Sequence, residues 1–427
     1  MNNPIKALWA RVQGTRDGRA LASNFGYLLL LQVASYIFPL LTIPYLARVI
    51  GVEGFGKIAF AAAVVMGFRT LADWGFNFTA TRDVARHRDN PEKVAEIFSN
   101  VLWARLLLML LSLLLLLGAI AVVPYFQAQK NLLLITFLLV PGHILFPAWF
   151  FQAMERMKYI TLFDLLSKAL FTALIFIFIK EKSDYMLQPL FLSLGYMFTG
   201  VGAMYVVLVQ WQVRLKAPRW SAIYRTIHSS TDVFINNLMP NLYTNFSVML
   251  LGFMGGSVAN GLLDAGSKFA NIAQQLMTVL SRVFFPFLSR KSEKHSLYLK
   301  INLVSAVVCA LGLLLTAPVL VPVFFTPEFA GAVPVLQILA VSIVFLALSN
   351  AYGTHYMIIK GHEKQLKNIT IGCSLVGFIA AFPLIYTYGH IGAALTIACT
   401  RVLLGVTVSY TARRIIRQGY EYECSNT

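Results

Sequence analysis

Nine ionisable side chains interrupt the long apolar segments of this 427-residue chain. A charge at the centre of a membrane-spanning helix costs at least roughly 2.5–3.5 kcal/mol, so each such group must face protein or water. Six of the nine are basic, which leaves a net charge of +3. A path lined in this way attracts an anion, and Arg and Lys both suit phosphate. The nine residues are Arg69, Asp73, Arg105, Asp164, Lys168, Asp264, Lys268, Arg282 and Arg401.

Three acid–base pairs among these residues have a local interpretation. Two pairs are spaced by four with the acid first, which is the favourable order for a pair on one helix, and the third has the reverse order. The members of each pair either neutralise one another or take part in binding, and the spacing leaves both interpretations open. The pairs are Asp164/Lys168, Asp264/Lys268 and Arg69/Asp73.

The remaining bases differ in their depth. Arg105 lies about one turn from the cytoplasmic end of its span and is expected to extend to the interface. Arg282 lies two turns from its end, where the same interpretation competes with a functional one. Arg401 lies about ten residues from either end with no acid at i±3 or i±4, and Lys268 lies at a similar depth. Arg401 therefore needs an acid on another helix, water or an anionic ligand.

These residues give two sets of site predictions. The acids Asp264, Asp73 and Asp164 are expected to be charge partners or to couple an ion. The predicted substrate-binding residues are Arg401, Lys268, Arg69, Lys168, Arg282 and Arg48.

Prolines and asparagines mark further special positions. Pro39 and Pro44 lie five apart in the first span, where they free backbone carbonyls and form either a static kink or a moving hinge. Asn237, Asn241 and Asn245 are spaced by four and form one polar stripe, which should face other helices or a wet cavity.

The amino-acid composition indicates whether water or lipid surrounds most of the chain. The chain is 58% hydrophobic and 12% charged, whereas about a quarter of the residues are charged in an ordinary soluble domain. With a mean hydropathy of +0.69, most of the chain must face lipid. We therefore predict an all-α polytopic membrane protein.

Apolar runs of about twenty residues, the length of a membrane span, predict twelve transmembrane helices. The predicted spans are 24–48, 55–76, 101–123, 131–151, 160–179, 186–211, 231–254, 258–288, 299–325, 333–358, 367–388 and 391–412.

The connections between these spans predict the orientation. One side carries 24 Lys and Arg residues and the other side 5, which places the first side, with both termini, in the cytoplasm. The connections at 77–100 and 212–230 are the longest. They favour two six-helix lobes, with an N-terminal lobe at 1–215 and a C-terminal lobe at 216–427, as in transporters built from repeats.

Several classes of function are excluded or disfavoured. The net charge of +17 is explained by cytoplasmic loops, and no basic soluble domain is present to bind nucleic acid. The chain has no HExxH, GxxxxGK[ST] or GxSxG motif, so we expect no enzymatic activity. The four cysteines suggest neither disulfides nor a metal cluster, and no cofactor is expected.

Four stretches resemble the Wzx O-antigen flippases, a branch of the superfamily that includes the multidrug antiporters and the lipid II flippases. The first contains the Pro39/Pro44 pair and ends in a glycine-rich GFG sequence. The chain departs from the family pattern at 261–265, where an aromatic residue is more usual. The stretches are residues 32–56, 73–82, 147–158 and 349–353.

The resemblance implies a MATE-like, V-shaped bundle of two six-helix lobes that works by alternating access. The implied substrate is an undecaprenyl-diphosphate-linked oligosaccharide, moved from the cytoplasmic to the periplasmic leaflet of the bacterial inner membrane. The family is thought to hold the sugar diphosphate in a cationic cavity. Coupling to a proton or another ion, and contact with membrane lipids and polysaccharide-assembly proteins, are further implied.

Two other classes remain as alternatives. An ion-coupled exporter of drugs or metabolites typically captures cations and favours unpaired acids, whereas the unpaired residues here are bases. A membrane glycosyltransferase or polymerase needs a large polar outer loop, and the predicted outer loops are short.

Overall fold

The computed structural model describes residues 16–290 and 295–425, and the regular elements in this part of the chain are helical. Nine helical segments within these residues are long and apolar enough to cross a membrane. The chain is therefore a multi-pass membrane protein, as its composition predicts. Six of the nine segments have the length of one span or slightly more. The other three run for 56 to 62 residues and are Leu30–Arg86, Trp220–Ser281 and Glu363–Gln418.

Each of these three long segments contains a glycine at which two helices meet. The φ angles of Gly51, Gly256 and Gly389 are 66°, 75° and 56°. This region of backbone space is readily available only to glycine. The helices that contain the three glycines are α2 (Arg16–Asp73), α12 (Asn245–Arg290) and α15 (Glu363–Ser425).

The chain forms two compact units. The first contains the chain up to Val49 and Val65–Ile235, and the second contains Ile50–Val64 and the chain from Asn236. The first unit holds most of α2 together with α3 (Phe76–Arg86), α4 (Pro91–Val122), α5 (Pro124–Ala128), α6 (Lys130–Phe137), α7 (Leu139–Leu145), α8 (Ala148–Ala153), α9 (Met157–Phe178), η1 (Lys182–Met186), α10 (Leu187–Tyr205), η2 (Val206–Gln210) and most of α11 (Trp220–Tyr243). The second holds α12, α13 (His295–Phe324), η4 (Pro327–Phe329), α14 (Ala332–Ser349), η5 (Asn350–Ile358) and α15.

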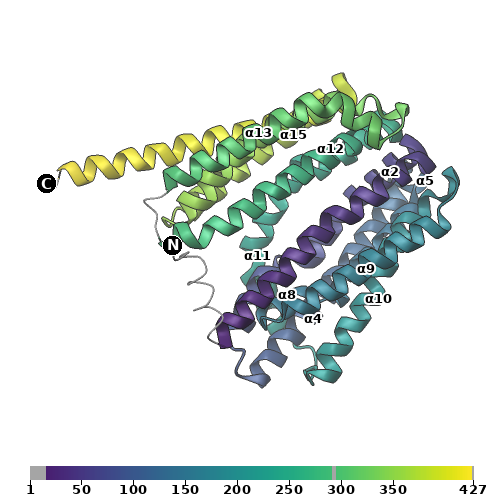
Figure 1. The fold of residues 1–427 in the computed structure, drawn as a ribbon. Helices are drawn as coiled ribbons and strands as arrows, with labels where there is room; N and C mark the ends of the chain where they lie inside the picture. The colour runs from purple at the N-terminus through teal and green to yellow at the C-terminus, as the bar shows by residue number, and fades with distance from the viewer. Residues whose placement is uncertain (1–15, 291–294, 426–427) are drawn as a thin grey trace, which may run out of the picture. The chain divides into compact units, whose positions relative to one another are not determined.

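Small residues bring α10 close to its neighbours in the first unit, where α9 and α10 lie side by side (Figure 1). A Cβ atom at Gly142 of α7 would lie 2.9 Å from the Cβ of Tyr196 on α10. A Cβ at Gly200 would lie 2.7 Å from the Cβ of Leu145. Small residues at helix interfaces allow such close packing inside membranes. The packing brings Tyr196 next to α7.

The turn between α2 and α3 is fixed to α11. The Trp74 ring stacks on Phe234, with ring centroids 3.9 Å apart and planes inclined by 4°. Its indole N–H donates to the carbonyl of Ile227 at 3.1 Å. The next residue, Gly75, has a φ of 79°. The sequence between the two helices thus combines an aromatic anchor with a glycine that can make the turn.

Replacing Gly75 by Ala is expected to destabilise the protein by roughly 2–5 kcal/mol. The left-handed conformation costs an alanine about 1–2 kcal/mol, and overpacking typically costs about 1–3 kcal/mol. The added methyl would lie 2.8 Å from Cγ1 of Val233. The measurement is the thermal unfolding midpoint of the full chain in detergent. The control is Gly118→Ala on α4, where nothing lies within 4 Å of the added carbon. Equal midpoints for both variants would show that the turn tolerates a side chain.

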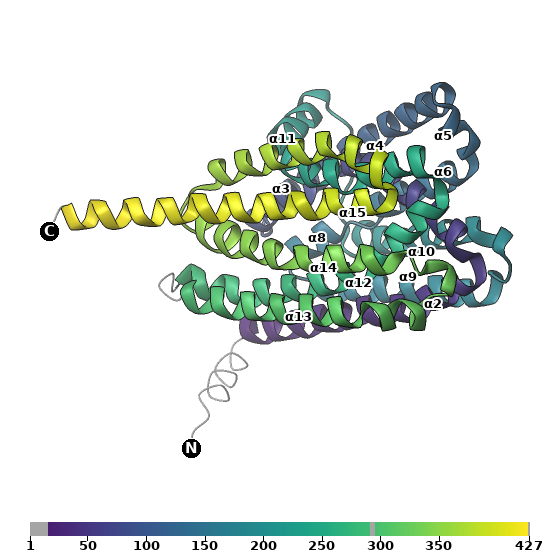
Figure 2. The same ribbon diagram turned by 90° about the horizontal axis from the view of Figure 1, so that it is seen from above.

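The segment 50–64 of α2 packs inside the second unit. The Phe55 ring meets Phe325 and Phe329 edge to face, with centroids 5.9 and 5.7 Å apart. The backbone N–H of Val52 donates to the Glu328 carboxylate at 3.5 Å. In the same unit, α14 lies between α13 and α15 (Figure 2).

Two predicted segments differ from the structure. The span predicted at 131–151 consists of three helices, α6, α7 and α8, and the breaks fall at Leu138 and at Phe146–Pro147. The connection predicted at 77–100 is largely helical, because α3 and the first turns of α4 fill it. The Asn90 side chain accepts from the backbone N–H of Lys93 at 3.1 Å and starts α4 as an N-cap.

Candidate functional site

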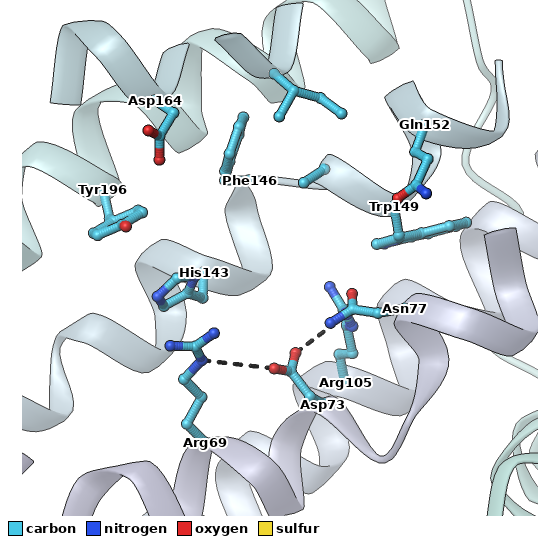
Figure 3. A pocket seen from close by; sticks show the side chains of 12 residues that line it. Arg69, Asp73, Asn77, Arg105, His143, Phe146, Trp149, Gln152, Asp164 and Tyr196 are labelled. Carbon is cyan, nitrogen blue, oxygen red and sulfur yellow. Dashed lines mark hydrogen bonds and ion pairs between the residues drawn. The ribbon is translucent and has the colours of Figure 1, made fainter. Parts of the chain in front are cut away.

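A cavity of about 350 Å³ lies inside the first unit. Its wall combines charged, amide and aromatic side chains, and Figure 3 shows ten of them labelled around a shared space. They come from α2, α3, α4, α7, α8, α9, α10 and the break before α8. The lining residues are Arg69, Asp73, Asn77, Arg105, His143, Phe146, Ala148, Trp149, Gln152, Ile160, Asp164 and Tyr196.

The break between α7 and α8 places part of this wall. Phe146 and Pro147 have non-helical backbone angles, and α8 starts again at Ala148. Proline has no N–H to continue the helical hydrogen bonds. The carbonyl of Trp149 accepts a hydrogen bond from the Thr81 hydroxyl on α3 at 3.2 Å. This bond fixes α8 against α3 and holds Trp149 at the cavity.

A chain of charged groups forms the floor of the cavity. Asp73 lies between two bases: its carboxylate is 3.7 Å from Nε of Arg69 and 3.2 Å from Nη2 of Arg105. The same Nη2 donates to Oδ1 of Asn77 at 2.7 Å. These contacts join the end of α2 to α3 and α4 (Figure 3). The i,i+4 contact of Arg69 with Asp73 is therefore one part of a larger network.

The expectation that Arg105 extends to the membrane interface is wrong. Its side chain is only 3% exposed. The cause is the carboxylate of Asp73 and the amide of Asn77, which offer charge-assisted hydrogen bonds inside the unit. Because Asp73 and Asn77 bind Nη2 of Arg105 inside the unit, the side chain does not extend to the water at the interface.

The second predicted pair is also present. Lys168 and Asp164 form an ion pair on α9. Lys168 Nζ also donates to the Ser35 hydroxyl of α2 at 2.8 Å. Asp164 lines the cavity and Lys168 does not, so Lys168 links the cavity wall to the first part of α2.

Arg401 is 8% exposed in the second unit and is held by neutral groups. Nη1 donates to the Ser342 hydroxyl of α14 at 3.1 Å. In the amide orientation that satisfies both groups, the oxygen of Gln274 accepts from the two terminal nitrogens at 2.5 and 2.8 Å. No described carboxylate pairs with this guanidinium. The Tyr243 side chain is a further hydrogen-bonding partner. All of these partners are neutral side chains on other helices, and none is the acid that the depth of Arg401 in its span suggested. The charge of Arg401 is therefore not compensated by the described residues.

Lys268 has an acidic partner on its own helix and is more exposed than Arg401. Its ammonium lies 3.0 Å from the Asp264 carboxylate on α12. The same ammonium lies 5.8 Å from the centre of the Phe55 ring, within the range of a cation–π interaction. Its side chain is 36% exposed, so it is accessible where Arg401 is not.

The three asparagines form a continuous stripe on one side of α11 and the start of α12. The Asn245 amide donates to the Asn241 side-chain oxygen at 2.9 Å. The Asn241 amide donates to the backbone carbonyl of Asn237 at 3.0 Å. Asn237 is exposed on the surface of its unit.

The other predicted site residues are dispersed. Pro39 and Pro44 lie within α2, and the residue with non-helical angles in that helix is Gly51. Arg48 is exposed, and the Arg282 side chain lies outside the described residues.

Of all the predicted site residues, the cavity brings together Arg69, Asp73 and Asp164. The sequence did not predict five further cavity residues as site residues. Three of them lie in the flippase-like stretches 73–82 and 147–158, which were the available signal. The five are Asn77, His143, Trp149, Gln152 and Tyr196.

A family model described as "Polysaccharide biosynthesis protein" matches residues 21–292, more than half of the chain. The chain belongs to this family. The resemblance to the Wzx O-antigen flippases is confirmed at this level.

Curated relatives extend the match over most of the chain. Two proteins carry the name "Putative O-antigen transporter". The one from Escherichia coli (strain K12) is 29% identical over 393 residues, which cover 90% of this chain and 95% of the relative. The one from Shigella dysenteriae is 27% identical and also covers 90% of this chain, and 98% of its own length. A third relative, "Succinoglycan biosynthesis transport protein ExoT" of Rhizobium meliloti (strain 1021), is 25% identical, with 77% of this chain and 67% of that protein covered.

Solved structures share the fold of this family member. An inward-facing multidrug MATE transporter of the MOP superfamily superposes with a TM-score of 0.65 at 16% identity, covering 88% of this chain and 95% of that one. The lipid II flippase MurJ superposes with a TM-score of 0.68 at 14% identity, covering 90% of this chain and 87% of that one. The MATE-like fold predicted from the sequence is confirmed.

Proposed function

We propose that this protein is a flippase for undecaprenyl-diphosphate-linked O-antigen oligosaccharide. It moves this lipid from the cytoplasmic to the periplasmic leaflet of the bacterial inner membrane by alternating access. The observation that carries the proposal is the 29% identity, over 90% of the chain, with the relative named "Putative O-antigen transporter". The relative from Rhizobium meliloti, named for succinoglycan transport, supports the same substrate class. The proposed activity is transport without enzymatic chemistry.

Arg401 supports an anionic headgroup as the cargo. A buried guanidinium with neutral partners leaves a positive charge in an apolar unit, and a diphosphate could supply the missing negative charge. Lys268 offers a second, more exposed base. We assign these two residues to the diphosphate, and we assign the coupling proton or ion to the acids Asp264, Asp73 and Asp164.

The helical segments support twelve spans with both termini in the cytoplasm. Counting each of the three glycine-broken segments as two spans and the other six as one gives twelve. An even number returns the chain to the side on which it began, and the distribution of Lys and Arg favours the cytoplasm. We further propose that 1–215 and 216–427 act as two six-helix lobes that rock during transport, with Pro39 and Pro44 as a hinge.

An ion-coupled exporter of small molecules is the alternative within the same fold. The relatives matched over most of the sequence carry polysaccharide names, and the base without a described acid is Arg401. Both observations favour the lipid-linked sugar.

Deleting the gene in its native host is expected to abolish long-chain surface polysaccharide and to leave lipid-linked oligosaccharide in the cytoplasmic leaflet. The measurements are gel analysis of surface polysaccharide and access of the lipid-linked sugar to a periplasmic probe. A plasmid copy of the gene should restore the polysaccharide. Normal long-chain polysaccharide in the deletion strain, in a host without a second flippase, would refute the proposal.

A further inference from the structure

Some polar groups at the cavity of the first unit have no partner in the described part of the chain. The Tyr196 hydroxyl on α10 and the Gln152 side-chain amide on α8 make no hydrogen bond to a described residue. The indole N–H of Trp149 likewise has no described acceptor. Gln152 is exposed, so the cavity can be reached from outside its unit. These groups are available to a ligand, whereas Nη2 of Arg105 and the side-chain oxygen of Asn77 are occupied with each other. Nε of Arg105 is buried and has no hydrogen-bond partner among the described residues.

Aromatic rings form much of the same wall. Phe146, Trp149 and Tyr196 all line the cavity (Figure 3). His143 lies against Tyr196, with ring centroids 4.3 Å apart. Tyr and Trp each combine a flat apolar ring with one polar group. A sugar ring has the complementary character, because its C–H faces are apolar and its hydroxyl rim is polar.

The size of the cavity limits the ligand. Its volume of about 350 Å³ is at the lower end of the range for small-molecule sites, roughly 300–1,000 Å³. A single sugar ring fits such a space, and a whole lipid-linked oligosaccharide does not.

The bases around the cavity are already paired with acids. Arg69 and Arg105 both contact Asp73, and Lys168, which lies outside the lining, pairs with Asp164. A diphosphate would have to compete with these carboxylates, in contrast to the environment of Arg401, which has no acidic partner among the described residues. Neutral hydroxyl and amide groups can still accept from the bases and donate to the acids.

We propose that this cavity binds one uncharged sugar ring of the transported oligosaccharide, which packs against the Tyr196 ring and is hydrogen-bonded by Tyr196 and Gln152. The assignment rests on the proposed flippase function. It adds a binding site for the sugar of the substrate, whose diphosphate we assign to Arg401 and Lys268.

Equilibrium binding to the purified full-length protein in detergent tests this assignment. One probe is the undecaprenyl-diphosphate oligosaccharide extracted from the deletion strain, and the other is undecaprenyl diphosphate without sugar. Tyr196→Phe removes one hydroxyl and Gln152→Ala removes an exposed amide, so neither is expected to disturb the fold. Each should weaken binding of the sugar-bearing probe roughly threefold to tenfold, which corresponds to one lost hydrogen bond. Binding of the sugar-free probe should not change.

The matched control is Tyr205→Phe, an exposed tyrosine at the end of the same helix, α10. It should bind both probes like the unchanged protein. If Tyr196→Phe and Gln152→Ala both bind the sugar-bearing probe normally, or weaken both probes equally, the sugar site is refuted while the flippase proposal stands. If the unchanged protein binds neither probe, the proposed function itself fails.

Discussion

Replacing Arg401 by Ala is expected to abolish restoration of surface polysaccharide in the deletion strain. The guanidinium lies almost completely inside the second unit, and its described partners are the neutral side chains of Ser342, Gln274 and Tyr243. Its charge is therefore available to attract an anionic headgroup. The measurement is the amount of long-chain polysaccharide at equal protein level in the membrane. Arg414→Ala, an exposed arginine on the same helix, is the matched control and should restore polysaccharide fully.

A second variant separates the charge of Arg401 from its packing. Gln274→Glu keeps the shape of the side chain and gives the guanidinium a carboxylate in place of an amide. Such a pair forms a charge-assisted hydrogen bond, so the protein should remain folded. If Arg401 attracts an anion, this variant should lose most of its ability to restore polysaccharide. Full restoration by Gln274→Glu would instead make Arg401 a packing residue. Full restoration by both Arg401→Ala and Lys268→Ala would refute the cationic site.

The partners of Arg401 illustrate what the sequence can and cannot predict. Its depth follows from the apolar run around it, so burial and the need for a distant partner could be predicted. The identity of that partner could not, because Gln274 and Ser342 lie on other helices and are ordinary polar residues in sequence. Hydrophobic periodicity shows which residues share one face of a helix, but it does not show which other helix packs against that face.

The same distinction applies to the first unit. The i,i+4 spacing predicted the contact of Arg69 with Asp73, which is local. It did not predict that Arg105, from the next span, would reach the same carboxylate. Distance from the end of a span is a poor guide to whether an arginine extends to the interface when a half-buried acid on another helix is within reach.

The cavity itself depends on breaks that hydropathy does not reveal. One apolar run at 131–151 predicted one helix, but the structure contains three. The break at Pro147 sets the position of Trp149, and glycines at 142 and 200 bring Tyr196 close to α7. Composition and hydropathy thus predicted the class of fold, while tertiary packing formed the site.

Replacing Arg105 by Gln is expected to destabilise the protein by about 3–5 kcal/mol, because the guanidinium loses its contacts with Asp73 and Asn77 and each hydrogen bond of a charged group contributes about 1.5–3 kcal/mol. The change leaves Asp73 with Arg69 at 3.7 Å and removes the donor to Asn77. The measurement is the thermal unfolding midpoint in detergent. The control is Arg88→Gln, which breaks the exposed pair with Glu155 and should cost at most about 1 kcal/mol.

The double variant Asp73→Asn with Arg105→Gln tests whether the cost comes from the acid that has lost one of its two bases. The Arg69 side chain is 29% exposed, so water can solvate it without the acid, and two neutral amides can hydrogen-bond to each other. The double variant should therefore be more stable than Arg105→Gln alone. A midpoint equal to that of the single variant would mean that the long arginine side chain, rather than its charge, holds α4 against α2 and α3. Neither substitution replaces Tyr196 or Gln152. The network around Asp73 therefore supports the floor of the cavity, while the proposed contacts to the sugar come from the opposite residues on α8 and α10.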